Sequence, residues 1–522
     1  MITVLGVGTV GPGAVVHDAT LVVGARRHLA AAELPPNAER IELGPLAPAL
    51  AAIETHLGLR RTSAAPRADA TSGPRGTEPP ATDGQPDSAT ASAHAPKGPH
   101  GTDAIPPTHR PNNGQVSTAD GHTDTGPDTT PTPATNRTAN GGMTPTHATA
   151  HRPGGTSTSD TAPGTAAARR RVVVLASGDP GFFGIVRALA ERFGVGVLDV
   201  RPSVPAVAVA FARVGLPWDD AVVVSAHGRD PRIAVNVCRA RPKVAVLTGP
   251  GAGPAELGAA LDAAGVPRAL VVATALGDPH GGERVVRVTP AGAAARDWPD
   301  GGHVVLCLDE ARMLAPAQRT IGGPPPGPAG WALPEAAFEH RDSMVTKYEV
   351  RALALARLGP RLGDLVWDVG AGSGSVAVEC ARLGAAAIAV ERTGDGAARC
   401  LANAAAHGVD IQAVHGEAPA ALEELPDPDA VFVGGGGAEL PAIVAACARR
   451  ARRVIVVTLA ALDRVASARE ALAAGGLVPD GVLLQSARLA PLPGDVTRLA
   501  SVNPVFVLWG SRPGTQEEGA HS

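Results

Sequence analysis

The order of apolar and polar positions divides most of the chain into two regions in which strands and helices alternate. In the first region, short apolar runs alternate with amphipathic runs, which predicts an α/β domain with largely parallel strands. Its predicted strands are Thr3–Leu5, Arg171–Ala176, Gly196–Val200, Ala221–Ser225, Val244–Thr248, Ala269–Thr274 and His303–Leu308. Its predicted helices are Ala47–Leu57, Phe182–Phe193, Ala206–Val214, Arg232–Arg239 and Pro254–Ala264.

The second region follows a linker at residues 311–330, which contains the proline- and glycine-rich run Ile321–Gly330. Its predicted helices include Lys347–Leu358 and Ser375–Leu383, and its predicted strands are Leu365–Val369, Ala386–Glu391, Ile411–His415, Ala430–Val433 and Val454–Leu459. Two last runs, Val482–Leu489 and Pro504–Trp509, have no helix between them and predict a terminal hairpin. We expect a Rossmann-like domain over residues 331–510 and a disordered tail at 511–522, fraying from Gly510.

A long polar segment interrupts the first region. Between residues 61 and 168 the large apolar residues are Ile105, Val116 and Met143, and the rest is rich in Thr, Pro, Ala, Gly, Ser, Asp and His. Such a stretch buries too little apolar surface to offset its ordering entropy, so we predict a disordered insert. Its histidines are irregularly spaced, which argues against a metal-binding tract. The first domain is therefore expected to comprise residues 1–60 and 169–310.

Composition and charge exclude several classes of protein. The chain of 522 residues carries 46 Lys and Arg against 50 Asp and Glu, a net charge of −4, which argues against nucleic-acid binding through phosphate contacts. The five cysteines form no CxxC pair, which indicates a reducing compartment and no cysteine zinc site. No apolar stretch reaches the roughly 18 residues that span a bilayer. We expect a cytoplasmic protein with no metal, nucleic-acid or membrane partner.

The most informative motif lies in the second region, between the strand ending in Asp368-Val369 and the next helix. It consists of Gly370, Ala371, Gly372, Ser373 and Gly374. Glycines let the backbone turn tightly against a ligand, and a helix N-terminus adds a positive end. Glu391 ends the following strand, where a carboxylate can accept both hydroxyls of a ribose, and Glu417-Ala418 follows the third strand. The pattern is more similar to class I S-adenosylmethionine (SAM) methyltransferases than to nicotinamide-binding proteins or a plain turn.

The first region carries glycine and polar motifs where its predicted strands end. These are Gly6 and Gly8, then Gly178-Asp179-Pro180, then Ser203, and finally His227-Gly228-Arg229. Ligands of α/β sheets bind at the carboxyl ends of the strands. Each motif alone is compatible with ordinary turn chemistry, but together they favour a ligand site.

These motifs carry a family resemblance. The segment Gly178–Gly184 has the GDPxxxG pattern of the tetrapyrrole (precorrin) methylase family, and Gly215–Asp219 with Ser225–Arg229 resemble its branch that methylates carbon 5. The second region resembles the enzymes that methylate carbon 15 and decarboxylate a ring-C acetate. The segments that carry this second resemblance are Pro334–Phe338, Met344–Arg351, Asp368–Gly374, Gly416–Pro419, Val433–Gly435 and Arg498–Val505.

The chain as a whole therefore resembles the fused precorrin C5,15-methyltransferases (decarboxylating) of cobalamin biosynthesis. The resemblance implies a two-lobed tetrapyrrole-methylase domain, a class I methyltransferase domain, two SAM sites, a tetrapyrrole substrate and a homo-oligomer. The implied activity is methylation of carbons 5 and 15 with loss of the acetate carboxyl, from precorrin-6B to precorrin-8X. The expected SAM contacts are Thr346, Gly370, Ala371, Gly372, Ser373, Gly374, Glu391, Glu417 and Ala418 in one domain, and Gly6, Gly8, Gly178, Asp179, Pro180 and Ser203 in the other.

The substrate carries many carboxylates, for which arginine is well suited. Its expected contacts are His227, Arg229, Lys347, Arg351 and Arg498. No catalytic residue is assigned, and the proton donor for decarboxylation stays open between His340, Tyr348 and Glu417.

One departure concerns Ala275, which stands where related carbon-5 methylases carry a glutamate before Leu-Gly. This puts a contact at that position in doubt. Two other functions stay open, namely a methyltransferase acting on another substrate such as tRNA, and a non-catalytic scaffold with decayed sites.

Overall fold

The computed structural model describes residues 1–8, 16–59, 170–278, 282–299, 301–314, 322–323, 327–328, 330–341 and 345–514. The predicted insert at 61–168, most of the linker and residues 515–522 of the predicted tail lie outside these ranges. Within them, no helix is long and apolar enough to cross a membrane.

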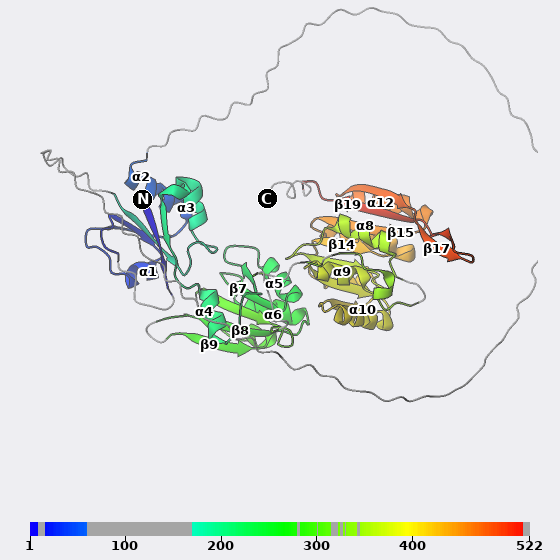
Figure 1. The fold of residues 1–522 in the computed structure, drawn as a ribbon, viewed down its shortest axis with the longest axis horizontal. Helices are drawn as coiled ribbons and strands as arrows, with labels where there is room; N and C mark the ends of the chain where they lie inside the picture. Colours follow the sequence, from blue (N-terminus) through cyan, green and yellow to red (C-terminus); the bar gives the residue numbers. More distant parts are fainter. Residues whose placement is uncertain are drawn as a thin grey trace, which may run out of the picture. The chain divides into compact units, whose positions relative to one another are not determined.

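The first sheet is fully parallel, with strand order β3-β2-β4-β1-β5. Its strands are β1 (Ile2–Val7), β2 (Leu21–Gly24), β3 (Glu39–Glu42), β4 (Val172–Ser177) and β5 (Leu198–Arg201), accompanied by α1 (Arg26–Ala31), α2 (Leu46–Leu57) and α3 (Val186–Phe193) (Figure 1). Buried apolar residues such as Ile2, Val4 and Val174 form its core with Ile53 of α2. Since all strands point the same way, β1, β4 and β5 end at one edge.

The second sheet has the order β6-β7-β10-β8-β9 and is mixed. It contains β6 (Val222–Ser225), β7 (Lys243–Leu247), β8 (Ala269–Thr274), β9 (Arg284–Val288) and β10 (His303–Leu308), with α4 (Ala206–Arg213), α5 (Pro231–Ala240), α6 (Pro254–Ala263) and α7 (Pro290–Ala294). Only the β6–β7 pairing is parallel, whereas β10 runs antiparallel to β7 and β8, and β9 to β8. The prediction of largely parallel strands is therefore wrong for this sheet. The link between β8 and β9 is too short for the helical crossover that parallel neighbours need.

The third sheet has seven strands in the order β13-β12-β11-β14-β15-β19-β16. Five strands are mutually parallel: β11 (Leu365–Val369), β12 (Ala386–Glu391), β13 (Gln412–His415), β14 (Ala430–Val433) and β15 (Val454–Leu459). β19 (Val505–Ser511) pairs antiparallel with β15, and the edge strand β16 (Val478–Leu484) pairs antiparallel with β19 and so runs in the same direction as the first five. The helices are α8 (Tyr348–Leu358), α9 (Ser375–Arg382), α10 (Gly394–Ala406), α11 (Leu440–Arg450) and α12 (Val465–Ala474).

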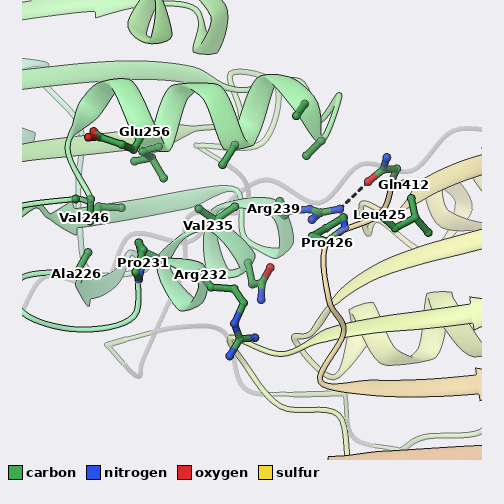
Figure 2. A pocket seen from close by; sticks show the side chains of 18 of the residues that line it. Ala226, Pro231, Arg232, Val235, Arg239, Val246, Glu256, Gln412, Leu425 and Pro426 are labelled. Carbon is green, nitrogen blue, oxygen red and sulfur yellow. Dashed lines mark hydrogen bonds between the residues drawn. The ribbon is translucent and has the colours of Figure 1, made fainter. Parts of the chain in front are cut away.

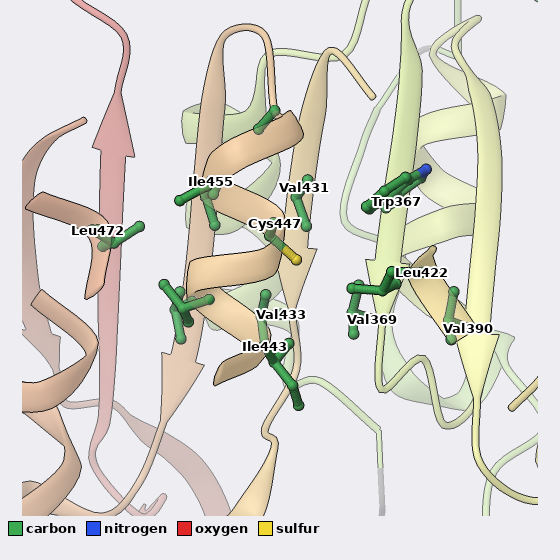
Figure 3. Packing of buried hydrophobic residues seen from close by; sticks show 14 of the residues in the cluster. Trp367, Val369, Val390, Leu422, Val431, Val433, Ile443, Cys447, Ile455 and Leu472 are labelled. Carbon is green, nitrogen blue, oxygen red and sulfur yellow. The ribbon is translucent and has the colours of Figure 1, made fainter. Parts of the chain in front are cut away.

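The largest core cluster packs one face of this sheet. Figure 3 shows Trp367 and Val369 of β11, Val431 and Val433 of β14, and Cys447 of α11. Strands that are buried on both faces have continuous apolar sequences, which explains why the sequence predicts where they begin and end.

The expected antiparallel pair at the end of the chain is present, because β16 pairs with β19, but its first strand has other bounds and a second hairpin lies between the two strands. The strand β16 ends at Leu484, and β17 (Ala487–Leu492) pairs with β18 (Val496–Ser501) as a separate two-stranded hairpin. The predicted run at 482–489 therefore spans two different strands. Gly510 and Ser511 belong to β19 and pair with β15, so fraying does not begin at Gly510.

The predicted helix at 182–193 begins later than expected, at Val186. The residues before it form tight turns, in which Phe183 has a φ of 53° and the carbonyl of Pro180 accepts a hydrogen bond from the Val186 N–H at 3.2 Å. A left-handed residue is incompatible with a continuous helix, so the GDPxxxG segment is a loop.

Polar contacts join the second sheet to the amino ends of the strands of the third sheet. The Arg232 guanidinium donates to Asp429, 2.7 Å away, and Asp429 also accepts the Leu365 N–H at 2.8 Å. The Asn236 amide donates to the carbonyl of Gly363 at 2.9 Å. Because Gly363, Leu365 and Asp429 lie at or before strand starts, this contact occupies the edge opposite the carboxyl ends of β11 and β14.

Candidate cofactor and substrate sites

The glycine loop joins β11 to α9 at the carboxyl edge of the third sheet. Gly370 donates its N–H to the carbonyl of Val390 at 2.9 Å, which ties the loop to the end of β12. Gly370, Gly372 and Gly374 have φ values of 74°, 59° and 70°, a conformation that residues with a Cβ disfavour. A Cβ at Gly374 would also lie 2.9 Å from the Cys400 sulfur, so this glycine allows α9 to begin against α10.

Ala371 and Ser373 complete the loop but face the interior. Ser373 is buried, and its carbonyl accepts a hydrogen bond from the Asn403 amide at 2.8 Å. Ala371 packs against the cluster around Phe338 and Cys400. Both residues therefore shape the loop, and neither side chain lines the pocket beside it.

Glu391 ends β12 and turns toward the glycine loop. One carboxylate oxygen accepts the Gly372 N–H at 3.0 Å, and the other accepts the Thr393 N–H and hydroxyl at 3.1 and 2.9 Å. A carboxylate has about four acceptor positions, so one is left for a further donor such as a ribose hydroxyl. A Cβ at Gly396 would lie 2.5 Å from Glu391 Cγ, so the absence of a side chain there leaves room for this carboxylate.

A pocket of about 540 Å³ opens between these elements. Gly370 and Gly372 line one side and Glu391 another, and the loop after β13 contributes Glu417 and Ala418. The volume lies in the range of small-molecule sites. Five of the residues expected to bind SAM in this domain therefore surround one cavity.

Asp368, directly before the loop, is fully buried. Its Oδ2 accepts the Ala377 N–H at 2.9 Å, whereas Oδ1 has no hydrogen-bond partner. Burial raises the pKa of Asp368 to about 7, and the negative charge of Glu391 contributes in the same direction. The carboxyl thus caps the first turn of α9 and titrates near neutral pH.

A second pocket of about 400 Å³ shares Gly434 and Gly435 with the first. These two glycines follow β14, and Gly434 donates its N–H to the carbonyl of Val369 at 2.9 Å. The residues common to the two pockets are glycines without side chains, so a ligand in one pocket could lie close to a ligand in the other.

The second pocket combines apolar walls with cationic side chains. Thr346 and Lys347, at the start of α8, line it together with Arg464, which follows β15. Among the described residues neither Lys347 nor Arg464 has an ion-pair partner, so both charges are available for anionic groups. Its apolar lining residues are Val345, Val350, Leu440, Leu459 and Val505. Thr346, expected at the cofactor, thus lies beside Lys347, expected at the substrate.

Arg351 does not reach this pocket, and the expectation that it contacts substrate is wrong. Its side chain is fully buried, donates to the carbonyls of Thr346 (2.5 Å) and Leu333, and lies 4.7 Å over the Phe338 ring. Glu379 lies 3.7 Å from its Nε. Arg351 therefore fixes the segment that carries Thr346 and Lys347 without touching the cavity.

Arg498 is exposed on β18 of the small terminal hairpin and lines neither pocket. Of the three candidate proton donors, Glu417 lines the first pocket. His340 is hydrogen-bonded through Nδ1 to the Phe338 carbonyl at 2.9 Å, and Tyr348 is exposed at the start of α8. The geometry therefore does not select a proton donor.

The motifs of the first sheet converge at its carboxyl edge. Gly178 donates its N–H to the Val7 carbonyl at 2.9 Å and accepts the Ser203 N–H at 3.2 Å. A Cβ at Gly6 would lie 2.2 Å from the Gly178 oxygen and 2.4 Å from the Ser203 nitrogen, so only glycine fits between these strands. The expected residues Gly6, Gly178 and Ser203 are therefore in direct backbone contact.

The neighbouring motif residues have local roles. Asp179 accepts the Gly181 N–H at 2.8 Å and Pro180 is buried in the same turn. Gly8 is the last described residue before the gap at 9–15. His227 and Arg229 are exposed after β6 in the second sheet, and His227 packs against Gly249 after β7.

Several lining residues were not predicted from the sequence. Arg392 and Thr393 lie between β12 and α10, Asp395 and Arg399 lie in the first two turns of α10, and a run of four glycines, 434–437, follows β14. The glycine run was visible in the sequence at the end of a predicted strand. Nothing in the sequence pointed to Arg464 as a pocket residue, because its position near Lys347 depends on how β15 and α8 pack.

Two family models match the chain. One, described as the precorrin methyltransferase domain, covers residues 336–507, and the other, tetrapyrrole (corrin/porphyrin) methylases, covers residues 134–294. The residues that line the two pockets sharing Gly434 and Gly435 all lie within the first match. Gly178, Ser203 and His227 lie within the second.

Curated relatives agree with these matches. The precorrin-6Y C(5,15)-methyltransferase [decarboxylating] of Sinorhizobium sp is 40% identical over 51% of this chain, and the match spans 63% of that relative's length. The probable cobalt-precorrin-6B C(15)-methyltransferase (decarboxylating) of Pyrobaculum calidifontis is 37% identical over 34% of this chain and 93% of its own length. The solved C-terminal domain of precorrin-6Y C5,15-methyltransferase from Rhodobacter capsulatus is 36% identical over 35% of this chain and 98% of that domain, with a TM-score of 0.32.

Proposed function

The chain belongs to the precorrin methyltransferase family, and from this membership we propose that it is a SAM-dependent enzyme that methylates a precorrin at carbons 5 and 15. The proposed reaction at the second site also removes the carboxyl of the ring-C acetate, so that precorrin-6B becomes precorrin-8X in cobalamin biosynthesis. Residues 331–510 would form the carbon-15 domain, and residues 1–60 with 169–310 the carbon-5 domain.

The observation that carries the proposal is the pair of pockets that meet at Gly434 and Gly435. One pocket offers a glycine loop and the Glu391 carboxylate, a donor and acceptor set suited to the amino-acid and ribose parts of SAM. The other offers Lys347 and Arg464, which suit the carboxylates of a tetrapyrrole. The glycine wall allows the two ligands to meet.

When bound, SAM supplies an electrophilic methyl group. The protein's contribution is to hold an electron-rich carbon of the macrocycle in line with it and to exclude water. The cations Lys347 and Arg464 would orient the macrocycle by its carboxylates. The apolar side chains of Val345, Val350 and Leu459 would desolvate the acetate carboxylate, which favours its release as neutral carbon dioxide. The electron pair of the broken carbon–carbon bond would pass into the conjugated macrocycle, and a proton would replace the carboxyl group.

The carbon-5 site is proposed at the edge where Gly6, Gly178 and Ser203 meet. The backbone there approaches without side chains, which suits close contact with a cofactor. His227 and Arg229 are proposed as substrate contacts at the end of β6. Two SAM sites per chain follow from this assignment.

The proposal is tested by incubating the full chain with precorrin-6B and SAM that carries an isotopically labelled methyl group. Mass spectrometry is expected to detect transfer of two labelled methyl groups and release of one carbon dioxide. Transfer of a single methyl group would remove the carbon-5 assignment. Transfer to tRNA but not to the precorrin would favour the tRNA methyltransferase alternative.

A further inference from the structure

A separate cavity of about 520 Å³ lies between α5 and α6 of the second sheet and the loops that precede β13 and β14 (Figure 2). It is at the amino edge of the third sheet and shares no residue with the pockets at Gly434. Most of its wall is apolar, including Val235, Val246, Leu257, Ala260 and Leu425. Cavities of this size at domain contacts are common ligand sites.

Arg239 closes one end of this cavity, as Figure 2 shows. Only 5% of the residue is exposed. Its guanidinium donates to Oε1 of Gln412 at 2.7 Å, and among the described residues no carboxylate forms an ion pair with it. Arg232, about two turns earlier on α5, differs because it forms an ion pair with Asp429 at 2.7 Å.

A buried guanidinium without a carboxylate is costly, because an uncompensated charge has lost its hydration. Burial accordingly lowers the pKa of Arg239 to about 10. A guanidinium presents five N–H donors, and the hydrogen bond to Gln412 uses one of them, which leaves donors for a bidentate acceptor.

The other charged residues of the lining do not neutralise Arg239. Glu256 lies at the opposite end of the cavity in Figure 2, at the start of α6, where its carboxylate accepts the Gly253 N–H at 3.0 Å. Glu424 is exposed on the loop before β14 and makes no ion pair with Arg239. The cavity thus has an apolar body and one buried cationic end.

We propose that this cavity binds a small amphipathic monoanion, whose apolar body lies between α5 and α6 and whose carboxylate or sulfonate is held by Arg239. This site is independent of the proposed methyl transfer, because it lies at the opposite edge of the third sheet from the cofactor pocket.

The test uses 8-anilinonaphthalene-1-sulfonate, a fluorescent apolar monoanion, with the full chain and excess S-adenosylhomocysteine to fill cofactor pockets. We expect saturable binding to one site and displacement by decanoate. Decanol, which has the same chain without the charge, should compete about tenfold less well, since it lacks the charge-assisted bonds.

Two variants and a matched control locate the probe. Arg239→Gln removes the charge, and we expect binding to weaken about tenfold or more. Ala260→Leu fills the apolar part of the cavity and leaves Arg239 intact, and it should abolish binding. Arg284→Gln, an exposed arginine on β9, makes the same charge change elsewhere and should leave binding unchanged.

If Arg239→Gln does not fold, the test rests on Ala260→Leu. Decanoate should raise the melting temperature of the wild-type chain and should not raise that of Ala260→Leu. Probe binding that is equal in the wild type and in Ala260→Leu would overturn the proposal. So would failure of decanoate to displace the probe.

Discussion

At the scale of single residues, the two carboxyl groups beside the glycine loop, those of Asp368 and Glu391, lie in different environments. Glu391 is held by three donors in the cofactor pocket, whereas Asp368 is buried with one oxygen unpartnered. The raised pKa of Asp368, about 7 against 3.8, means that the folded state binds a proton that the unfolded state releases above about pH 4. This residue's contribution to stability is therefore lost as pH rises from about 4 to about 7.

Asp368→Asn removes this titration, so the fall in unfolding free energy between pH 5 and pH 8 should be smaller in the variant. Between pH 5 and a pKa of about 7 the limit is about 2.7 kcal/mol, at about 1.36 kcal/mol per pH unit. Urea unfolding at both pH values measures the difference. The exposed Asp463→Asn is the control and should keep the wild-type slope. An unchanged slope in Asp368→Asn would show that the carboxyl does not titrate in this range.

Lys347 and Arg464 give a second prediction at this scale. Because each charge would form hydrogen bonds with a substrate carboxylate, Lys347→Gln and Arg464→Gln should each raise the KM of the carbon-15 step about tenfold, with a smaller change in kcat. Carbon-5 methylation, followed separately in the same samples, should not change. The exposed Arg498→Gln serves as a control, and an equal effect there would contradict the assignment of the second pocket.

At the scale of elements, the carboxyl edge of the third sheet depends on close backbone packing. Gly374 combines a φ of 70° with a Cβ position 2.9 Å from the Cys400 sulfur and 3.1 Å from its Cα. Gly408, after α10, has a similar φ of 64° but no atom within 4 Å of its Cβ position. The two glycines therefore share backbone strain and differ in crowding.

We expect Gly408→Ala to cost about 1 kcal/mol of stability, from the left-handed conformation alone. Gly374→Ala should cost about 2–4 kcal/mol, because the clash between α9 and α10 is added. Chemical denaturation of both variants measures the difference. Equal costs would mean that α9 and α10 adjust without strain.

The sequence predicted these elements unevenly, for physical reasons. The strands Ala386–Glu391, Ala430–Val433, Val454–Leu459 and His303–Leu308 were predicted with the bounds they have, because buried strands are continuous apolar runs. The strands β3, β9 and β17 have mixed patterns and were missed or merged, and β2 was missed because its buried apolar run is only four residues long. Arg351 was placed at the substrate because charge is visible in a sequence, whereas the direction of a side chain at the start of a helix is not.

At the scale of the whole molecule, the contact between the second and third sheets constrains the reaction. Arg232, Asn236 and Arg239 reach residues at the strand starts, and Arg268 donates to Asp410 at 2.7 Å close to the start of β13. The cofactor pocket lies at the strand ends, across a sheet about 15 Å deep at roughly 3.3 Å per residue. We therefore expect an intermediate made at the proposed first site to reach the proposed second site through solvent and not through this contact.

Transfer through solvent has a direct consequence. A mixture of Gly6→Val, which blocks the first site, and Gly372→Arg, which blocks the second, should convert precorrin-6B to the final product although neither variant does so alone. The rate should rise with the concentration of both variants, because the intermediate diffuses between chains. Absence of product in the mixture, with each variant retaining its own half-reaction, would show that the intermediate passes within one chain.

The account rests most directly on two independent SAM sites in one chain, and calorimetric titration of SAM into the full protein measures this number. We predict a stoichiometry near two in the wild type and near one in Gly372→Arg, whose new side chain would occupy the glycine-loop pocket. A stoichiometry of one that is lost entirely in Gly372→Arg would contradict the first site, and no binding to the wild type would contradict the enzyme assignment itself.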